Sequence, residues 1–130
     1  MGREIILPDS SKATYDAYHF APGVRVGDLV VLSGQIGIGP TGAVPEAAAE
    51  EFRNAWQAIG DVLMAANLGF DSIIEYTTFH VGLREHLATF MQVRDEFISA
   101  PWPAWTAIGV SELAVPGARV EIRVMAKGVF

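Results

Sequence analysis

The pattern of apolar residues predicts two amphipathic helices. Between residues 47 and 67 apolar side chains recur at steps of three and four, so they line one face of a helix. Glutamates at its start suit the positive amino end, and Gly69 suits its carboxyl end. The same spacing recurs from Leu87 to Phe97, and Pro101 and Pro103 are expected to end that second helix.

Other segments have the pattern of strands. Residues 29–32 are a continuous apolar run, which predicts a strand buried on both faces that continues to residue 38 past a bend at Ser33 and Gly34. Residues 40–42 are predicted as a turn. Residues 74–81 alternate with threonine and aromatic residues, and residues 106–110 and 119–127 complete the set of strands.

The order of these elements favours one α+β domain over residues 1–130. Helices of this length can connect parallel strands, so we expect a mixed sheet with two helices on one face. No third helix is predicted to cover the other face. Self-association through that face is the simplest way to bury it.

Composition narrows the classes of function. The 130 residues carry a net charge of -6, and 51% of them are hydrophobic while 18% are charged, which favours burial of apolar surface in a homo-oligomer. The acidic balance argues against nucleic acid as a partner, because that binding depends on Lys and Arg. The chain has no cysteine, no secretory signal pattern and no apolar run of roughly 18 residues, so we expect a cytoplasmic protein without a membrane span.

Glu121 is the first candidate for chemistry. In its predicted strand Val120, Ile122, Val124 and Ala126 share one face, so Glu121 shares the other face with Arg119 and Arg123. The carboxylate either belongs to a solvated or ion-paired surface, or it positions and deprotonates a water molecule in a pocket. The segment alone favours the surface role.

Ser33, Gly34 and Gln35 are the second candidate, because a glycine where a strand breaks lets a ligand or another backbone come close. The alternative is a bulge that only bends the sheet. No Gly-x-Ser-x-Gly motif supports Ser33 as a covalent nucleophile.

Histidine and tryptophan residues offer weaker signals. His19, His80 and His86 lack the spacing of metal ligands, so we expect no metal site. Trp102 and Trp105 flank prolines, where they either pack in a core or a subunit contact or form an apolar wall for a ligand.

Together these segments resemble the Rid/YjgF family. The resemblance rests on LVVLSGQIG from Leu29 to Gly37, on Gly42, on the helix through residues 54–66, on Pro103 and Ala104, and on VEIRVMA from Val120. It implies a chorismate mutase-like (YjgF) fold and a homotrimer with a small-molecule ligand in clefts between subunits. The best known members hydrolyse reactive imines or enamines, such as 2-aminoacrylate, to the keto acid and ammonia without a cofactor.

The resemblance assigns roles to residues of this chain. Glu121 would handle the attacking water, and the backbone of Gly34 would meet the substrate, so these are the expected catalytic residues. Independently of the resemblance, the functional interpretation of the Ser33, Gly34 and Gln35 segment offers the polar side chains of Ser33 and Gln35 to a small polar ligand, so both are expected to bind the substrate. No cofactor is expected.

Three positions depart from the family pattern. Trp105 replaces the arginine that grips the substrate carboxylate in a bidentate fork. Phe20 aligns with a tyrosine and Met91 with an asparagine. These residues are expected to line a more apolar substrate site, in which a small 2-imino acid binds poorly.

Two functions follow from these observations. The first is hydrolysis of a larger or less anionic imine, enamine or related labile metabolite. The second is a noncatalytic trimeric module that binds a small metabolite or a protein. The missing cation has four candidate replacements, which are Arg119, Arg123 and a neighbouring subunit's Arg25 or Arg94.

Overall fold

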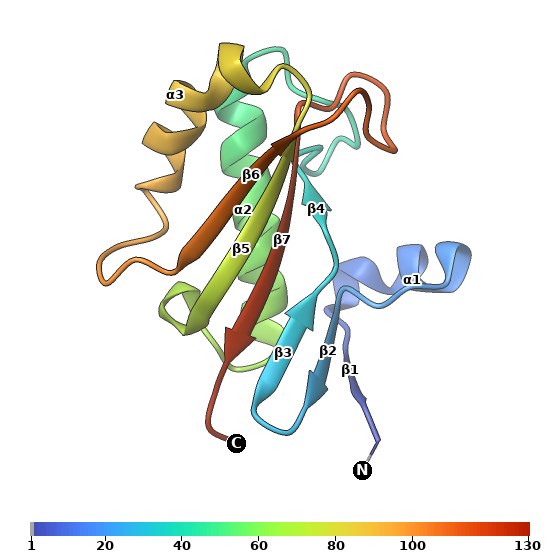
Figure 1. Ribbon diagram of the computed structural model, residues 1–130. Helices are drawn as coiled ribbons and strands as arrows, with labels where there is room; N and C mark the ends of the chain where they lie inside the picture. Colours follow the sequence, from blue (N-terminus) through green and yellow to red (C-terminus); the bar gives the residue numbers. More distant parts are fainter. Residues whose placement is uncertain (1) are drawn as a thin grey trace.

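Seven strands form one mixed sheet in the computed structural model, which describes residues 2–130 (Figure 1). The strand order is β1-β2-β3-β7-β5-β6, and β4 also pairs with β7. Only β5 and β6 run parallel; the other pairs are antiparallel. The strands are β1 (Glu4–Ile6), β2 (Gly23–Val26), β3 (Leu29–Leu32), β4 (Gln35–Ile36), β5 (Ile73–His80), β6 (Ala104–Gly109) and β7 (Val120–Lys127).

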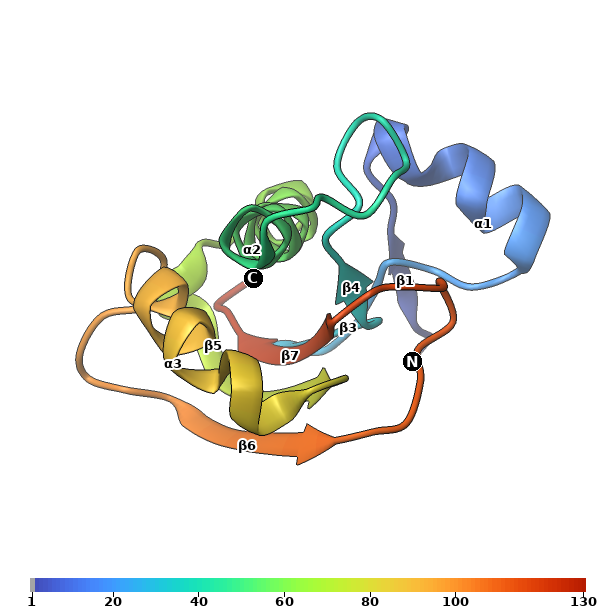
Figure 2. The ribbon, with the colours of Figure 1, turned by 90° about the horizontal axis from the view of Figure 1, so that it is seen from above.

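Two long helices, α2 (Ala48–Ala65) and α3 (Leu83–Arg94), cover one face of the sheet. Figure 1 shows α2 behind β5 and β7, and Figure 2 shows α3 beside α2 with β6 at the edge of the sheet. Both helices were predicted, but their ends differ. The chain leaves α2 through Asn67, whose φ is 60°, rather than at Gly69. Helix α3 starts four residues before Leu87 and ends at Arg94, well before the prolines.

The prediction that no third helix exists is wrong. A short helix, α1 (Lys12–Tyr18), follows a 3-10 turn, η1 (Asp9–Ser11), and a second turn, η2 (Phe70–Ser72), precedes β5. None of the residues of α1 is buried, and it lies beside β1 and β2 rather than over the open sheet face (Figure 1). Strands β1 and β2 were also missed, because each is too short to show a clear alternation.

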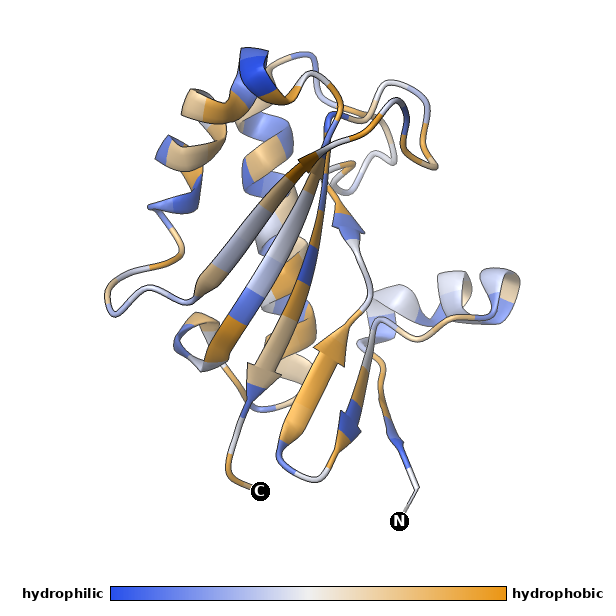
Figure 3. Ribbon diagram, viewed as in Figure 1, coloured by the Kyte–Doolittle hydropathy of each residue, from blue (hydrophilic) through white to orange (hydrophobic). Residues whose placement is uncertain are grey.

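Side chains alternate between the two sheet faces. Val120, Ile122, Val124 and Ala126 are buried under the helices, as predicted. In β3 only Val30 and Leu32 are buried, so the prediction that this strand is buried on both faces is wrong for a single chain. The uncovered face carries apolar side chains that are 37 to 50% exposed, namely Ile5, Val26, Leu29, Val31 and Ile108. Figure 3 shows the hydrophobic band along β3.

Glu51 of α2 is buried although it is charged (0% exposed). Its Oε1 accepts a hydrogen bond from Arg119 Nη1 at 2.7 Å, and its Oε2 accepts one from the Arg119 backbone N–H at 2.6 Å. The Arg119 guanidinium also donates to the carbonyls of Pro45 and Glu46. Arg119 therefore reaches toward α2, and the prediction that it shares a face with Glu121 is wrong.

No helix within residues 2–130 combines the length and the apolar character that crossing a membrane requires.

Buried His80 ends β5. Its Nε2 lies 2.7 Å from Thr78 Oγ1, and its ring packs edge-on against Phe90. Burial lowers the pKa of His80 from 6.5 to about 4, with a further lowering by His86. The imidazole is therefore neutral near pH 7.

We expect Glu51→Gln to lower the free energy of unfolding by about 3 kcal/mol, because Arg119 loses the charge that compensates its own. Urea unfolding at pH 7 measures this change. The control is Glu50→Gln, since Glu50 is an exposed neighbour in the same helix, and its effect should stay within about 0.5 kcal/mol. A similar small loss for both variants would contradict the structural role of Glu51.

His80 makes folding sensitive to acid. Its pKa is about 4 in the folded chain and 6.5 in the unfolded one, so the unfolded chain binds more protons between these values. We expect His80 to lower the free energy of unfolding by about 3 kcal/mol as the pH drops from 6.5 to 4. Below pH 4 its contribution should no longer change with pH. NMR titration of the His80 ring measures the folded pKa, and a midpoint near 6.5 would refute the prediction. In His80→Gln this contribution to the pH profile should disappear.

Candidate functional site

Glu121 and Gly34 meet at the uncovered face of the sheet. Glu121 is half-buried in β7, opposite Ile36 of β4 and Phe79 of β5. A Cβ atom built on Gly34 would lie only 2.6 Å from the carboxyl carbon of Glu121. The Glu121 carboxylate thus lies against the Gly34 backbone, in space that the Cβ atom of any other residue at position 34 would occupy. A carboxylate held beside an open backbone segment can accept a proton from a water molecule.

Ser33 and Gln35 hold the backbone around Gly34. Ser33 Oγ donates to the Ala21 carbonyl at 2.6 Å, and the Ser33 N–H donates to the Pro22 carbonyl at 2.8 Å. These bonds place the segment after Phe20 beside Gly34. Gln35 pairs with buried Ile122, so its side chain points toward the helices, and its Nε2 donates to the Ser33 carbonyl at 3.4 Å. Gln35 therefore does not share the uncovered face with the Glu121 carboxylate, whereas the Ser33 hydroxyl is bonded to the Ala21 carbonyl.

Phe20 lies at the rim of a hollow between α1 and the first two strands. The side chain is 44% exposed. The hollow has a volume of about 480 Å³ and is lined by Arg3, Ile5, Tyr15, Asp16, His19, Phe20, Ala21 and Val24. Phe20 is therefore near the Ser33 segment but also faces this separate hollow.

Trp105 lies on the opposite side of the sheet from Glu121. Its Nε1 donates to Thr78 Oγ1 at 3.0 Å, and its ring lies nearly parallel to that of Tyr76 with centres 5.8 Å apart. It also packs against Phe90 of α3. Within one chain the structure thus brings Gly34 and Glu121 together but does not bring Trp105 to them.

Arg94 accompanies Trp105, a grouping that the sequence pattern did not reveal. The guanidinium carbon lies 5.1 Å from the centre of the Trp105 ring and 5.8 Å from that of Trp102. Met91 precedes Arg94 by one helical turn and is 38% exposed, so both lie on the same side of α3. The only sequence signal was that Met91 and Arg94 occupy one helical stripe.

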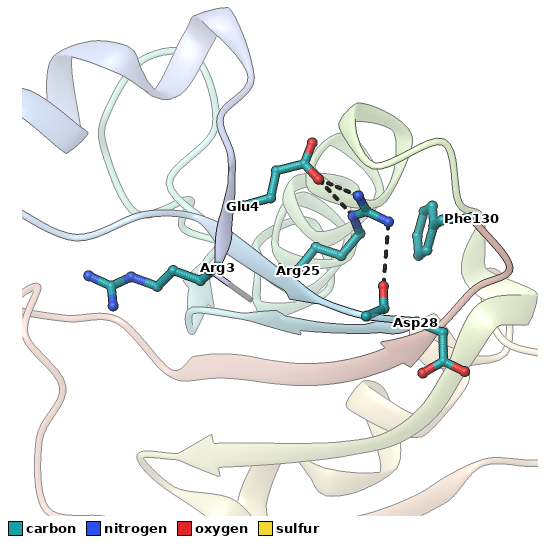
Figure 4. A pocket seen from close by; sticks show the side chains of 7 residues that line it. Arg3, Glu4, Arg25, Asp28 and Phe130 are labelled. Atoms are coloured by element: carbon teal, nitrogen blue, oxygen red, sulfur yellow. Dashed lines mark hydrogen bonds and ion pairs between the residues drawn. The ribbon is translucent and has the colours of Figure 1, made fainter.

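The other arginines differ in how they are engaged. Arg119 is held by Glu51. Arg25 forms an ion pair with Glu4 at 2.5 Å, and its guanidinium carbon lies 4.3 Å from the centre of the Phe130 ring. These side chains line a hollow of about 660 Å³ beside the termini. Figure 4 shows the Arg3 side chain pointing away from Arg25 and Glu4. Arg123 is exposed on the same face as Glu121 and has no ion pair among residues 2–130. Arg94 therefore contacts one predicted site residue, Trp105, and Arg123 shares the sheet face of another, Glu121.

Metal ligands do not gather anywhere in the described part of the chain, since no three His, Asp or Glu side chains within it are arranged to hold an ion. His80 pairs with Thr78, and His86 approaches Glu85 at 3.7 Å. These histidine contacts are with the protein itself.

Comparison with known proteins places the chain among relatives with similar sequences and folds. The sequence model described as Endoribonuclease L-PSP matches residues 10–127. RutC family protein YjgH of Escherichia coli is 34% identical over 126 residues, covering 96% of this chain and 95% of that protein. A 2-iminobutanoate/2-iminopropanoate deaminase of Bos taurus is 31% identical, covering 95% of this chain and 89% of that protein.

A solved structure of protein YJGH superposes with a TM-score of 0.89 at 32% identity, covering all of this chain and 99% of that one. The fold is thus the α+β, chorismate mutase-like fold expected from the resemblance, with its mixed sheet and two helices on one face. The agreement in sequence and in fold extends over nearly the whole chain. The chain therefore belongs to the Rid/YjgF family.

Proposed function

We propose that this protein is a Rid-like hydrolase that converts a reactive imine or enamine to the carbonyl compound and ammonia. The observation that carries the proposal is the contact between the Glu121 carboxylate and the Gly34 backbone. It supplies a proton acceptor beside a backbone that a small polar group can approach. The deaminase relatives support the same class of reaction.

In the proposed mechanism Glu121 orients a water molecule and accepts one of its protons as the oxygen adds to the imine carbon. The carbon–nitrogen double bond becomes a single bond in a tetrahedral carbinolamine. Glu121 returns that proton to nitrogen, which completes the neutral carbinolamine. It then accepts the proton of the new hydroxyl group and passes it to nitrogen, so that the carbon–nitrogen bond breaks and ammonia leaves as the carbonyl forms. The Gly34 backbone orients the nitrogen centre throughout.

A homotrimer is part of this proposal. The uncovered sheet face exposes apolar side chains on β1, β2, β3 and β6, which a second subunit would bury. Glu121 and Trp105 lie on opposite faces of one chain, so a cleft with both residues needs two subunits. We propose that Trp105 and Met91 of one subunit face Glu121 and Phe20 of the next.

The substrate in this proposal is larger or less anionic than a small 2-imino acid. An arginine at position 105 would offer a bidentate fork to a carboxylate, whereas Trp105 offers an aromatic ring whose N–H is already bound to Thr78. The name of the deaminase relatives refers to 2-iminobutanoate and 2-iminopropanoate. Imines as small as these would leave the apolar side chains of the proposed site, such as Trp105 and Met91, without contacts.

A noncatalytic trimer that binds a small metabolite is the second candidate. The observation in its favour is that Trp105 replaces a charged side chain and is packed under α3. Ligands found by thermal shift can be incubated with the protein and followed for turnover. Conversion of a bound compound, abolished in Glu121→Gln, would exclude this second function for that compound.

Glu121→Gln is expected to lower the rate of imine hydrolysis about 100-fold, because the amide cannot accept the proton of water. Imines generated in situ by an amino-acid oxidase supply the substrates, and ammonia release is the readout. Circular dichroism should show an unchanged fold. Equal rates for the variant and the unchanged protein would rule out the proposed role of Glu121.

Gly34→Ala should displace the Glu121 carboxylate and lower the same rate about 100-fold, as expected for a small misplacement of a catalytic group. The cost in stability should be small, since the clash is with the end of a flexible side chain. Gly109→Ala is the matched control, because a Cβ there meets only Leu83 at an ordinary 3.6 Å. An unchanged rate for Gly34→Ala would mean that the contact is not part of the site.

A further inference from the structure

Arg94 holds a positive charge against two indole rings. Its side chain is 13% exposed, and the guanidinium lies within 6 Å of both Trp102 and Trp105, a distance typical of cation–π contacts. The planar guanidinium is weakly hydrated and is well suited to stacking on aromatic rings. The pairing thus fixes a long, flexible side chain in one place at the edge of the sheet.

Part of the guanidinium remains free to bind a ligand. Arg94 Nε donates to Asp95 Oδ1 at 2.8 Å, and Nη1 donates to the Tyr76 hydroxyl at 3.4 Å. The other N–H groups have no hydrogen-bond partner among residues 2–130. In this part of the chain the buried side-chain atoms without a partner are Trp56 Nε1 and His80 Nδ1. Arg94 Nη2 has no partner and is not among them, so solvent reaches it.

The charge of Arg94 persists in this setting. Burial alone would lower its pKa, but the hydrogen bonds to Tyr76 and Asp95 raise the pKa above its ordinary value. Asp95 takes the Nε side and is 56% exposed, so solvent screens its charge. The Nη side is left for a second anion, for which a guanidinium fork has the right geometry.

Apolar groups frame this free side. Trp102 is 61% exposed beside the guanidinium, and Met91 is 38% exposed one turn earlier on α3. A ligand that reaches the Nη groups therefore also contacts an indole face or a thioether. The surroundings fit a molecule with one anionic group and an apolar body.

We propose that Arg94 is the anion-binding residue of the substrate cleft, so that the substrate is an imine of a larger amino acid that keeps its carboxylate. This inference rests on the proposed hydrolase function. The cation comes from α3 and is held by Trp105, which acts as a positioning residue for Arg94. Arg123 on the Glu121 face is the rival source of charge.

The test compares two imines that differ in the carboxylate. An amino-acid oxidase generates the 2-imino acid of phenylalanine, and an amine oxidase generates the corresponding imine of 2-phenylethylamine. Hydrolysis is followed as ammonia release for the unchanged protein, Arg94→Gln, Arg94→Lys and Arg123→Gln. The control is Arg53→Gln, since Arg53 forms a comparable ion pair with Glu96 but contacts neither tryptophan.

Arg94→Gln should lower kcat/KM for the phenylalanine-derived imine at least about tenfold and leave the carboxylate-free imine within about twofold. Arg94→Lys should recover only part of the loss, because a point charge replaces the fork. Adding Trp105→Arg to Arg94→Gln should restore much of the preference for the carboxylate. An equal loss on both imines, or a selective loss in Arg123→Gln instead, would overturn the assignment to Arg94.

A binding measurement separates this inference from the hydrolase function. Phenylpyruvate and its carboxylate-free analogue phenylacetone are stable probes whose Kd can be measured by calorimetry with each variant. If no imine is hydrolysed but Arg94→Gln weakens phenylpyruvate binding selectively, the hydrolase proposal fails and the anion site stands. If Arg94→Gln binds both probes as the unchanged protein does, the anion site fails whatever the activity. Thermal unfolding of each variant checks that the fold is intact.

Discussion

The buried contact between Glu51 and Arg119 determines how the sheet and its covering helices fit together. Glu51 near the start of α2 accepts hydrogen bonds from both the side chain and the backbone of Arg119, immediately before β7. Strand β7 pairs in turn with β3, β4 and β5, so its position sets that of the central sheet. Glu121 is two residues farther along. The position of the proposed catalytic carboxylate of Glu121 therefore depends on the Glu51 carboxylate, which lies on the opposite face of the sheet.

The same region shows why two glycines of one segment have different roles. A Cβ on Gly37 would lie 2.7 Å from the carbonyl carbon of Glu51, which is fixed backbone, so this glycine allows β4 to pass close to α2. Gly34 instead approaches the end of the Glu121 side chain. The first close approach belongs to the packing of the fold, and the second belongs to the proposed site. A substitution at Gly37 acts on packing, whereas one at Gly34 acts on the position of a carboxylate.

Much of the architecture could be predicted from the sequence because it is locally encoded. The stripe of α2 and the alternation of β7 have clear periods, and Gly34 and Glu121 belong to segments that identify the family. Contacts between distant segments were not predictable in the same way. The partner of Arg119 lies in α2, and the cluster of Arg94 with Trp102 and Trp105 joins α3 to the approach to β6. Nothing in the spacing of these residues shows which of them meet.

The position of Arg94 changes what tryptophan at position 105 implies about the charge of the proposed site. Loss of an arginine from one strand need not remove positive charge from a site when a helix residue places a guanidinium against the replacing ring. The surroundings of the positive charge differ, because the N–H donors of Arg94 lie beside Trp102 and one helical turn from Met91. Burial of a leucine- or phenylalanine-sized side chain against such groups contributes about 1.5 to 3 kcal/mol, or roughly 10- to 100-fold in affinity. In the proposed site a small imino acid would gain only the ionic contact, so the aromatic and cationic groups together would select for size as well as charge.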